Sequence, residues 1–295
     1  MSSVSSIRSV EYPFVGLGFS ATGSEAESIA HALLEGRADH LPAVDMLNVG
    51  VSTSNPPPAG LGALLKRASL SCVAHLEELN LVGTMDEAIL HRVVEACESL
   101  QPAWLQEDLG LWVWKGGALG AQMIAPILDE RSLAQAVRNV RRILEVSPYP
   151  FLAENPPFYY ALGDIDLLTF MARLADQTGC GLLLDIGHLI GYCVCTDRDP
   201  LAYIEQWTAF DHLVEIHLAG YARYGTSNAT MWRDSHENAI QPLALDVLDR
   251  VLERAGNVKA VTIEAEGARL DVLRYNVGCV SERLQPADAT THVQH

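Results

Sequence analysis

The sequence predicts a single (β/α)₈ barrel, and three observations support this prediction. Short apolar runs of β-type composition alternate with longer amphipathic segments, and the alternation repeats about eight times in 295 residues. No linker, repeat or low-complexity stretch marks a second domain. Strands that alternate with helices pair in parallel, and eight such units favour closure into a barrel. A doubly wound open sheet is the second choice.

The elements follow in order along the chain. The predicted strands are Phe14–Gly18, Val44–Val51, Leu70–His75, Ala103–Asp108, Pro150–Glu154, Gly181–Asp185, Leu213–Leu218 and Ala260–Glu264. Segments with helical periodicity include Glu25–Leu34, Asp86–Leu100, Ser132–Glu145, Asp164–Gln177 and Leu243–Ala255. Ser24 is the expected N-cap of the first helix, and Gly179 and Gly256 are expected to end later ones.

Composition limits the class of protein. Hydrophobic residues make up 49% of the chain, which suits a substantial core; we expect one domain over residues 1–285 and a disordered tail at 286–295. The apolar runs are too short to cross a bilayer, and the Ser-rich start lacks the apolar stretch of a secretory signal. A cytoplasmic location is the simplest interpretation. The net charge of −17 repels phosphate backbones and argues against nucleic acid as a partner.

Ionisable side chains gather where the predicted strands end. In chain order they are His75, Glu107 with Asp108, Glu154, Asp185 with His188, Glu215 with His217, the Asp234-Ser235-His236 segment in the loop beyond, and Glu264 with Glu266. In a parallel barrel all the strands end at one mouth, where active sites are built. Six consecutive strands therefore deliver histidine or carboxylate groups to the same rim.

Metal ions give this set a physical reason. Crowded carboxylates repel one another, and some would take up protons unless cations lay among them. The mixture of imidazole and oxygen ligands suits iron, manganese or zinc, and the ligands are too many for one ion. Each residue alone has an ordinary structural explanation: a strand-end histidine is often hydrogen-bonded in a core, and Glu215 with His217 also fits a buried salt bridge. The whole set at one rim favours a metal cluster.

These segments together resemble a known family, the multinuclear non-heme iron-dependent oxidases, which includes the methanobactin-biosynthesis oxidase and the thiaglutamate-pathway peptide oxidase. The resemblance covers about Gly16 to Glu266. The residues that carry it are Gly16-Leu17-Gly18-Phe19, Ala74-His75, Ala153-Glu154-Asn155-Pro156, Leu182-Leu183-Leu184-Asp185, Glu215-Ile216-His217-Leu218-Ala219-Gly220, Asp234-Ser235-His236 and Ile263-Glu264.

The resemblance implies a xylose-isomerase-like barrel that holds two or three iron ions and uses dioxygen to oxidise a residue, most often cysteine, of a ribosomally made precursor peptide. It also implies a small partner protein that recognises the peptide. The iron ligands carried over from the family are His75, Glu154, Asp185, His217, Asp234, His236 and Glu264. The chain departs from the family pattern at Asn48, Asp108, His188 and Tyr221; of these, Asp108 and His188 can still bind metal.

Other roles and functions stay open. Glu107 or Glu266, if unligated, is the expected proton carrier. Cys193 and Cys195 follow the Asp185–His188 segment closely, so a ligand or redox role for them is also considered. The main alternative function is a divalent-metal sugar isomerase or epimerase on the same barrel. A phosphodiesterase of the endonuclease IV type and a non-catalytic metal-binding scaffold are further alternatives.

Overall fold

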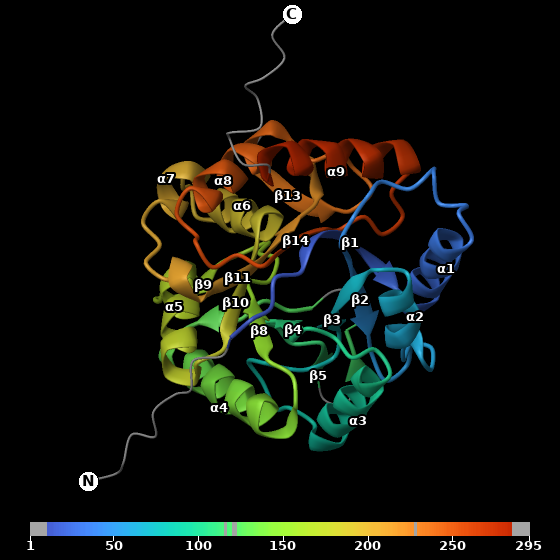
Figure 1. The fold of residues 1–295 in the computed structure, drawn as a ribbon. Helices are drawn as coiled ribbons and strands as arrows, with labels where there is room; N and C mark the ends of the chain where they lie inside the picture. The colour runs from blue at the N-terminus through green and yellow to red at the C-terminus, as the bar shows by residue number, and fades with distance from the viewer. Residues whose placement is uncertain (1–10, 115–116, 120–122, 227–228, 285–295) are drawn as a thin grey trace, which may run out of the picture.

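Eight parallel strands form a closed barrel in the computed structural model, which describes residues 11–114, 117–119, 123–226 and 229–284 (Figure 1). The strands are β1 (Gly16–Thr22), β2 (Met46–Val51), β3 (Ser71–Leu76), β4 (Leu105–Asp108), β8 (Phe151–Glu154), β10 (Gly181–Asp185), β11 (Leu213–Leu218) and β14 (Ala260–Ile263). Each pairs with the next in this order, and β1 pairs in parallel with β14 to close the ring. The predicted barrel is confirmed, and closure excludes an open doubly wound sheet.

Helices surround the barrel, as Figure 1 shows. They are α1 (Gly23–Leu34), α2 (Leu61–Arg67), α3 (Glu87–Glu98), α4 (Glu130–Val146), α5 (Leu167–Thr178), α6 (Ile186–Cys195), α7 (Pro200–Ile204), α8 (Pro242–Leu252) and α9 (Leu270–Leu284). In α4, Leu133, Val140 and Ile143 are buried at helical spacing, so one apolar stripe packs inward. The main core lies between such stripes and the outer faces of the strands.

A second, smaller apolar cluster fills the inside of the barrel near the amino-terminal ends of the strands. Its buried members are Val15, Met46, Val73, Trp104, Leu152, Leu183, Val214 and Ala260. Because successive side chains of a strand point to opposite faces, these residues share the barrel interior with polar residues that lie further along the same strands. The apolar cluster therefore forms a floor, and the polar groups are left for the mouth.

The loops at the mouth contain short additional strands. β12 (Gly220–Thr226) and β13 (Ala229–Ser235) form an antiparallel hairpin after β11. β5 (Val113–Trp114) pairs with β6 (Gly117–Ala118), and β7 (Ile127–Leu128) pairs with β9 (Leu162–Gly163). The expectation of a loop at Asp234 and Ser235 is wrong, because both residues end strand β13.

Several predicted boundaries are also wrong. β1 begins at Gly16 and runs to Thr22, while Phe14 lies before it with 79% of its surface exposed. The N-cap of α1 is Thr22 rather than Ser24, because Thr22 and Glu25 form a reciprocal capping box. Gly179 does end α5 in the left-handed conformation, with φ of 75°.

The other end of the chain gives two further outcomes. Helix α8 ends at Leu252, with Glu253 as its C-cap, so Gly256 does not end it as expected. The predicted tail at 286–295 lies outside the described residues. Among the helices that the structure describes, none combines the length and the apolar character needed to span a bilayer.

Candidate metal centre

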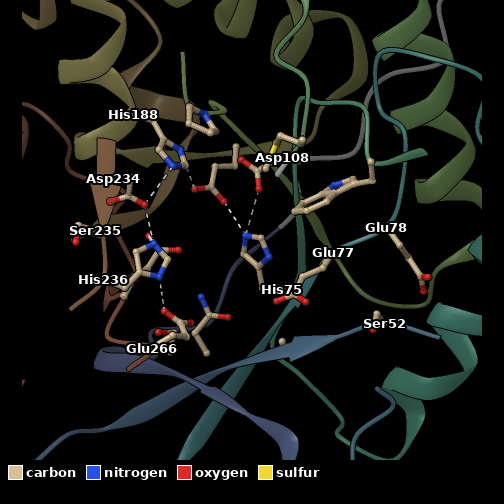
Figure 2. Close-up of a pocket in the computed structure, with 18 of the residues that line it drawn as sticks. Ser52, His75, Glu77, Glu78, Asp108, His188, Asp234, Ser235, His236 and Glu266 are labelled. Atoms are coloured by element: carbon tan, nitrogen blue, oxygen red, sulfur yellow. Dashed lines mark hydrogen bonds and ion pairs between the residues drawn. The ribbon is translucent and has the colours of Figure 1, made fainter. Parts of the chain in front are cut away.

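A polar cavity of about 760 Å³ opens at the carboxyl-terminal mouth of the barrel (Figure 2). The predicted residues that line it are His75, Asp108, Glu154, His188, Asp234, His236, Glu264 and Glu266. Asp185 and His217 do not line it, but both are fully buried and lie within ligand distance of residues that do. The structure thus brings together all nine candidate ligands from the ends of six strands, the first turn of α6 and the β12–β13 hairpin.

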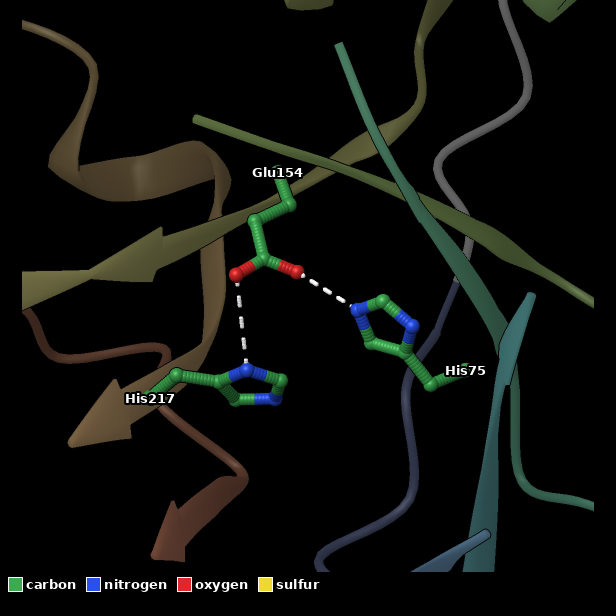
Figure 3. Close-up of side chains that lie close together, drawn as sticks. All are labelled: His75, Glu154 and His217. Carbon is green, nitrogen blue, oxygen red and sulfur yellow. Dashed lines mark hydrogen bonds and ion pairs between the residues drawn. The ribbon is translucent and has the colours of Figure 1, made fainter. Parts of the chain in front are cut away.

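Glu154, at the end of β8, lies at the centre of this arrangement. One of its carboxylate oxygens lies 2.9 Å from Nε2 of His75, and the other lies 3.4 Å from Nδ1 of His217 (Figure 3). The carboxylate is almost fully buried. A bridging carboxylate between histidines is the arrangement expected where neighbouring metal ions share a ligand.

The candidate ligands form four overlapping groups, in each of which the ligand atoms lie within 4.8 Å of one another. The groups are His75–Glu154–His217, Glu154–Asp185–His217–Glu264, Asp108–Glu154–His188 and Asp234–His236–Glu264. Glu154 belongs to three of them, and Glu264 links the second to the fourth. Groups that share carboxylates suit adjacent ions better than separate ones.

Unsatisfied atoms show that this donor set fits metal. Among the described residues, the buried side-chain atoms without a hydrogen-bond partner are Asn48 Oδ1, Asp108 Oδ1, Glu154 Oε1, Asp185 Oδ2, His217 Nδ1, Asp234 Oδ1 and Glu264 Oε2. Leaving a buried polar atom unpaired costs about 1–3 kcal/mol, so native proteins rarely do so without a reason. Six of these seven atoms belong to candidate metal ligands, which cations would satisfy.

The electrostatics of the protein groups alone indicate the same need for cations. Burial raises the pKa of Asp185 to about 8, and burial with the charge of Glu154 raises the pKa of Asp108 well above its usual range. Burial alone would lower the pKa of His75, but the hydrogen bond and charge of Glu154 outweigh it and raise the pKa to about 10. In the absence of metal, protons must therefore balance the crowded carboxylates.

Asn155 fixes the ends of β8 and β10 relative to each other. Its amide donates to the Asp185 carbonyl and accepts from the Asp185 N–H, at 2.9 and 2.8 Å. One carboxylate oxygen of Asp185 caps α6 by accepting from the His188 N–H, which leaves the other oxygen for the site. The Asn155 carbonyl lies 2.8 Å from Nδ1 of His188 and orients that ring. The sequence placed Asn155 beside Glu154 but gave it no role.

The β12–β13 hairpin brings a further arm of ligands to the cavity. Asp234 lies between two histidines, 2.6 Å from Nε2 of His236 and 3.7 Å from Nε2 of His188 (Figure 2). The opposite ring nitrogen of His236 lies 2.5 Å from Glu266. This hydrogen bond outweighs burial and lowers the pKa of Glu266 to about 2. Glu266 thus supports His236 from the cavity side.

Glu107 and Asp108 point to different places although they are neighbours. Asp108 lines the cavity, but Glu107 is not among the residues that line it. The Glu107 carboxylate accepts from the Leu79 N–H at 2.8 Å and from the Trp112 indole at 2.8 Å, and burial raises its pKa well above the usual range. This geometry anchors the loops around the mouth; a role for Glu107 in proton transfer stays a prediction.

A layer of polar residues lies beside the ligand His217, and sequence reasoning gave it no role in holding that ring. Glu215, Gln106 and Asn48 all lie within 3.2 Å of Nε2 of His217, and Asn48 also lines the cavity. The signal was the two-residue spacing: Glu215 precedes His217 by two positions, so the two residues share a strand face. His217 belongs to two of the ligand groups, and it also forms the ion pair with Glu215 that the sequence suggested.

The two cysteines of α6 lie outside the ligand groups of the described residues. Cys193 is buried, which raises the pKa of its thiol to about 12 and disfavours the thiolate. Cys195 donates to the Phe158 carbonyl. Neither lines the cavity, so the geometry does not support a ligand role for this pair, and a redox role stays a prediction.

Solved structures of similar fold are xylose-isomerase-like barrels. An L-ribulose 3-epimerase aligns with a TM-score of 0.63 and 13% identity, covering 92% of this chain and 94% of the other. A xylose isomerase-like TIM barrel protein from Mycobacterium smegmatis in complex with magnesium aligns with a TM-score of 0.55 and 12% identity, covering 93% and 98%. At these identities the likeness shows the fold alone.

Proteins related in sequence share a higher identity with this chain than these structures do. A UPF0276 protein of Anaeromyxobacter sp. (strain Fw109-5) is 26% identical over 76% of this chain and 80% of its own length, and a UPF0276 protein of Bordetella pertussis (strain Tohama I) is 28% identical over 72% and 73%. A family described as "RiPP precursor modification enzyme MbnB/TglH/ChrH" matches residues 37–275, which include all nine candidate ligands. The chain therefore belongs to the MbnB/TglH/ChrH family of enzymes that modify ribosomally made precursor peptides.

Proposed function

We propose that this protein is an iron- and dioxygen-dependent oxidase that modifies a residue, most often cysteine, of a ribosomally synthesised precursor peptide. The observation that carries the proposal is the set of four overlapping ligand groups joined by Glu154 and Glu264, with buried ligand atoms that lack any other partner. Membership of a peptide-modifying family supplies the substrate class.

The proposed ligands are His75, Asp108, Glu154, Asp185, His188, His217, Asp234, His236 and Glu264. Iron bound by such a mixed histidine and carboxylate set supplies redox chemistry with dioxygen and keeps a coordinated thiol deprotonated. Two or three ions would balance the carboxylate charge that protons balance in the apo protein. The protein's own contribution is to fix the ligands on rigid strand ends below a walled cavity.

The cavity suits one side chain and its flanking backbone rather than a large folded substrate. Its volume of about 760 Å³ lies in the usual range for small-molecule sites. The wall includes large or apolar side chains, Trp112, Val113, Met123 and Tyr159, and most of the remaining lining is polar. We infer that an extended peptide segment presents its reactive residue over the apolar wall, which limits the access of water.

Among the two proposed proton carriers, Glu266 has the better position. It lines the cavity and its side chain is 46% exposed, so its carboxylate can reach a bound substrate. Its carboxylate also contacts Nδ1 of His236. We therefore propose that Glu266 receives the proton that the substrate releases.

The proposal extends to the rest of the chain. We propose that residues 1–285 act as one domain in the cytoplasm and that a small partner protein presents the precursor peptide. The support for a peptide substrate is the family match; the partner is inferred from the resemblance to the iron-dependent oxidases. Binding of a leader peptide to a partner, but not to this chain alone, would be the expected result of a pull-down.

The test is to measure metal content by elemental analysis and Mössbauer spectroscopy, and then oxygen uptake. We expect two or three irons per chain, and oxygen consumption that requires both iron and precursor peptide. Undiminished turnover under anaerobic conditions would refute the oxidase. One or two zinc or manganese ions per chain with no oxygen uptake would instead favour the sugar isomerase or epimerase, for which the fold is the sole support.

A further inference from the structure

The ring of His217 lies between two different environments. Its Nδ1 faces the proposed metal centre, 3.4 Å from Glu154 and 3.3 Å from Glu264. Its Nε2 faces the floor of the barrel, 3.2 Å from Glu215. The ring is fully buried, so water cannot supply or accept a proton at either nitrogen. To bind metal through Nδ1, the neutral ring must carry its proton on Nε2.

Glu215 is built to accept that proton's hydrogen bond. One of its oxygens accepts from the Trp104 indole at 2.7 Å, and the other accepts from the Thr262 hydroxyl at 2.6 Å. Both donors are fully buried: Trp104 lies just before β4, and Thr262 lies on β14. They hold the carboxylate in one orientation, and the oxygen bonded to Thr262 is the one that lies beside Nε2 of His217.

Two amides compete for the same nitrogen. The side-chain nitrogens of Asn48 and Gln106 each lie 3.1 Å from Nε2. The Gln106 oxygen shares the single Trp104 N–H with Glu215, at the longer distance of 3.2 Å, and this orientation turns the Gln106 NH₂ group towards His217 and favours an unprotonated Nε2. Asn48 is less constrained, because its oxygen has no other partner and a half-turn of the amide would place that oxygen on Nε2. A hydrogen bond to a carboxylate is roughly twice as strong as one between neutral groups.

We propose that Glu215 is a positioning residue that decides this competition: it holds the proton of His217 on Nε2, so that Nδ1 presents its lone pair to a metal ion. The proposal rests on the proposed metal centre but concerns a residue outside it. Outer carboxylates that orient a ligating histidine raise metal affinity, and their loss typically lowers it 10- to 100-fold. Trp104 and Thr262 in turn keep Glu215 in place.

The experiment uses the full chain, and Zn²⁺ alone as a diamagnetic probe. Competition titration against a chelator measures Zn²⁺ affinity for the wild type, Glu215→Gln and Thr262→Val. We expect Glu215→Gln, which keeps the volume but loses the carboxylate, to weaken Zn²⁺ binding about 10- to 100-fold. Thr262→Val removes one donor to Glu215 but leaves the carboxylate beside His217, so its affinity should stay within about threefold while its melting temperature falls.

A second readout reports the tautomer directly. In the Zn²⁺-loaded wild type, ¹⁵N spectroscopy should show a protonated Nε2 for His217, assigned by its absence from His217→Asn. At the same free Zn²⁺ concentration the weaker site of Glu215→Gln should stay largely empty, and that signal should be lost. Wild-type affinity in Glu215→Gln, or an equal loss in Thr262→Val, would overturn the positioning role. Failure of the wild type to bind either Zn²⁺ or iron would overturn the metal centre itself and the proposal with it.

Discussion

Replacement of Glu154 by glutamine should dismantle most of the proposed metal centre in a single step. Glu154 belongs to three of the four ligand groups, so its loss leaves only Asp234–His236–Glu264 intact. Glutamine keeps the volume but removes the charge and one acceptor oxygen between His75 and His217. We expect bound iron to fall from two or three ions per chain to at most one.

The effect should also appear in stability. A ligand present at a hundred times its dissociation constant stabilises the native state by about 2.7 kcal/mol per site. For a chain of this size that corresponds to a melting-temperature increase of about 4 °C per site on metal addition. The wild type should show at least this increase, and Glu154→Gln should lose most of it.

Asp234→Asn is the matched control, because Asp234 is equally polar but belongs to only one group. It should lose about one ion per chain and keep the others. Both variants should be loaded anaerobically with Fe²⁺ and checked for folding by circular dichroism before elemental analysis. If Glu154→Gln retains the wild-type iron content and affinity, the inference that Glu154 bridges the ions is wrong.

Three further predictions concern other parts of the molecule. Metal uptake should release protons and strengthen as pH rises, because the raised pKa of His75, about 10, means that a proton must leave before the ring can bind. Calorimetry in two buffers of different ionisation enthalpy measures this release, and metal binding without proton release would contradict the prediction. Asn139→Ala should lower the free energy of unfolding by about 2–4 kcal/mol in urea, because this buried amide donates to three carbonyls of the loop after β3; a loss below about 1 kcal/mol would contradict this. Arg142→Ala should change the free energy of unfolding by less than about 1 kcal/mol despite the hydrogen bonds to Glu87, because both side chains are exposed. A larger loss in the same urea assay would show that solvent does not screen the pair.

Much of the site could be predicted from the sequence because strand ends carry positional information. Once eight strands alternate with helices, a residue such as His75 or Glu154 at the end of a strand must lie at the common mouth. The resemblance to a family then selected which of these residues are ligands. The prediction was weakest where local signals compete: Ser24 and Thr22 are both good caps, and only the partnership with Glu25 distinguishes them.

The direction of individual side chains could not be predicted in the same way. Glu107 and Asp108 are adjacent acidic residues at the end of β4, and the alternation of a strand sends only one of them into the cavity. The sequence also placed Asp234 in a loop, because an antiparallel hairpin depends on pairing between β12 and β13 rather than on local propensity.

The sequence by itself therefore determined the barrel, the order of its strands and the chemical types gathered at its mouth, because these follow from periodicity and strand ends. The tertiary structure decided which atoms meet: that Glu154 lies between His75 and His217, and that Glu215 lies beneath His217. The contact between His75 and Glu154 joins residues 79 positions apart through the closure of the sheet and its register, which no local pattern encodes.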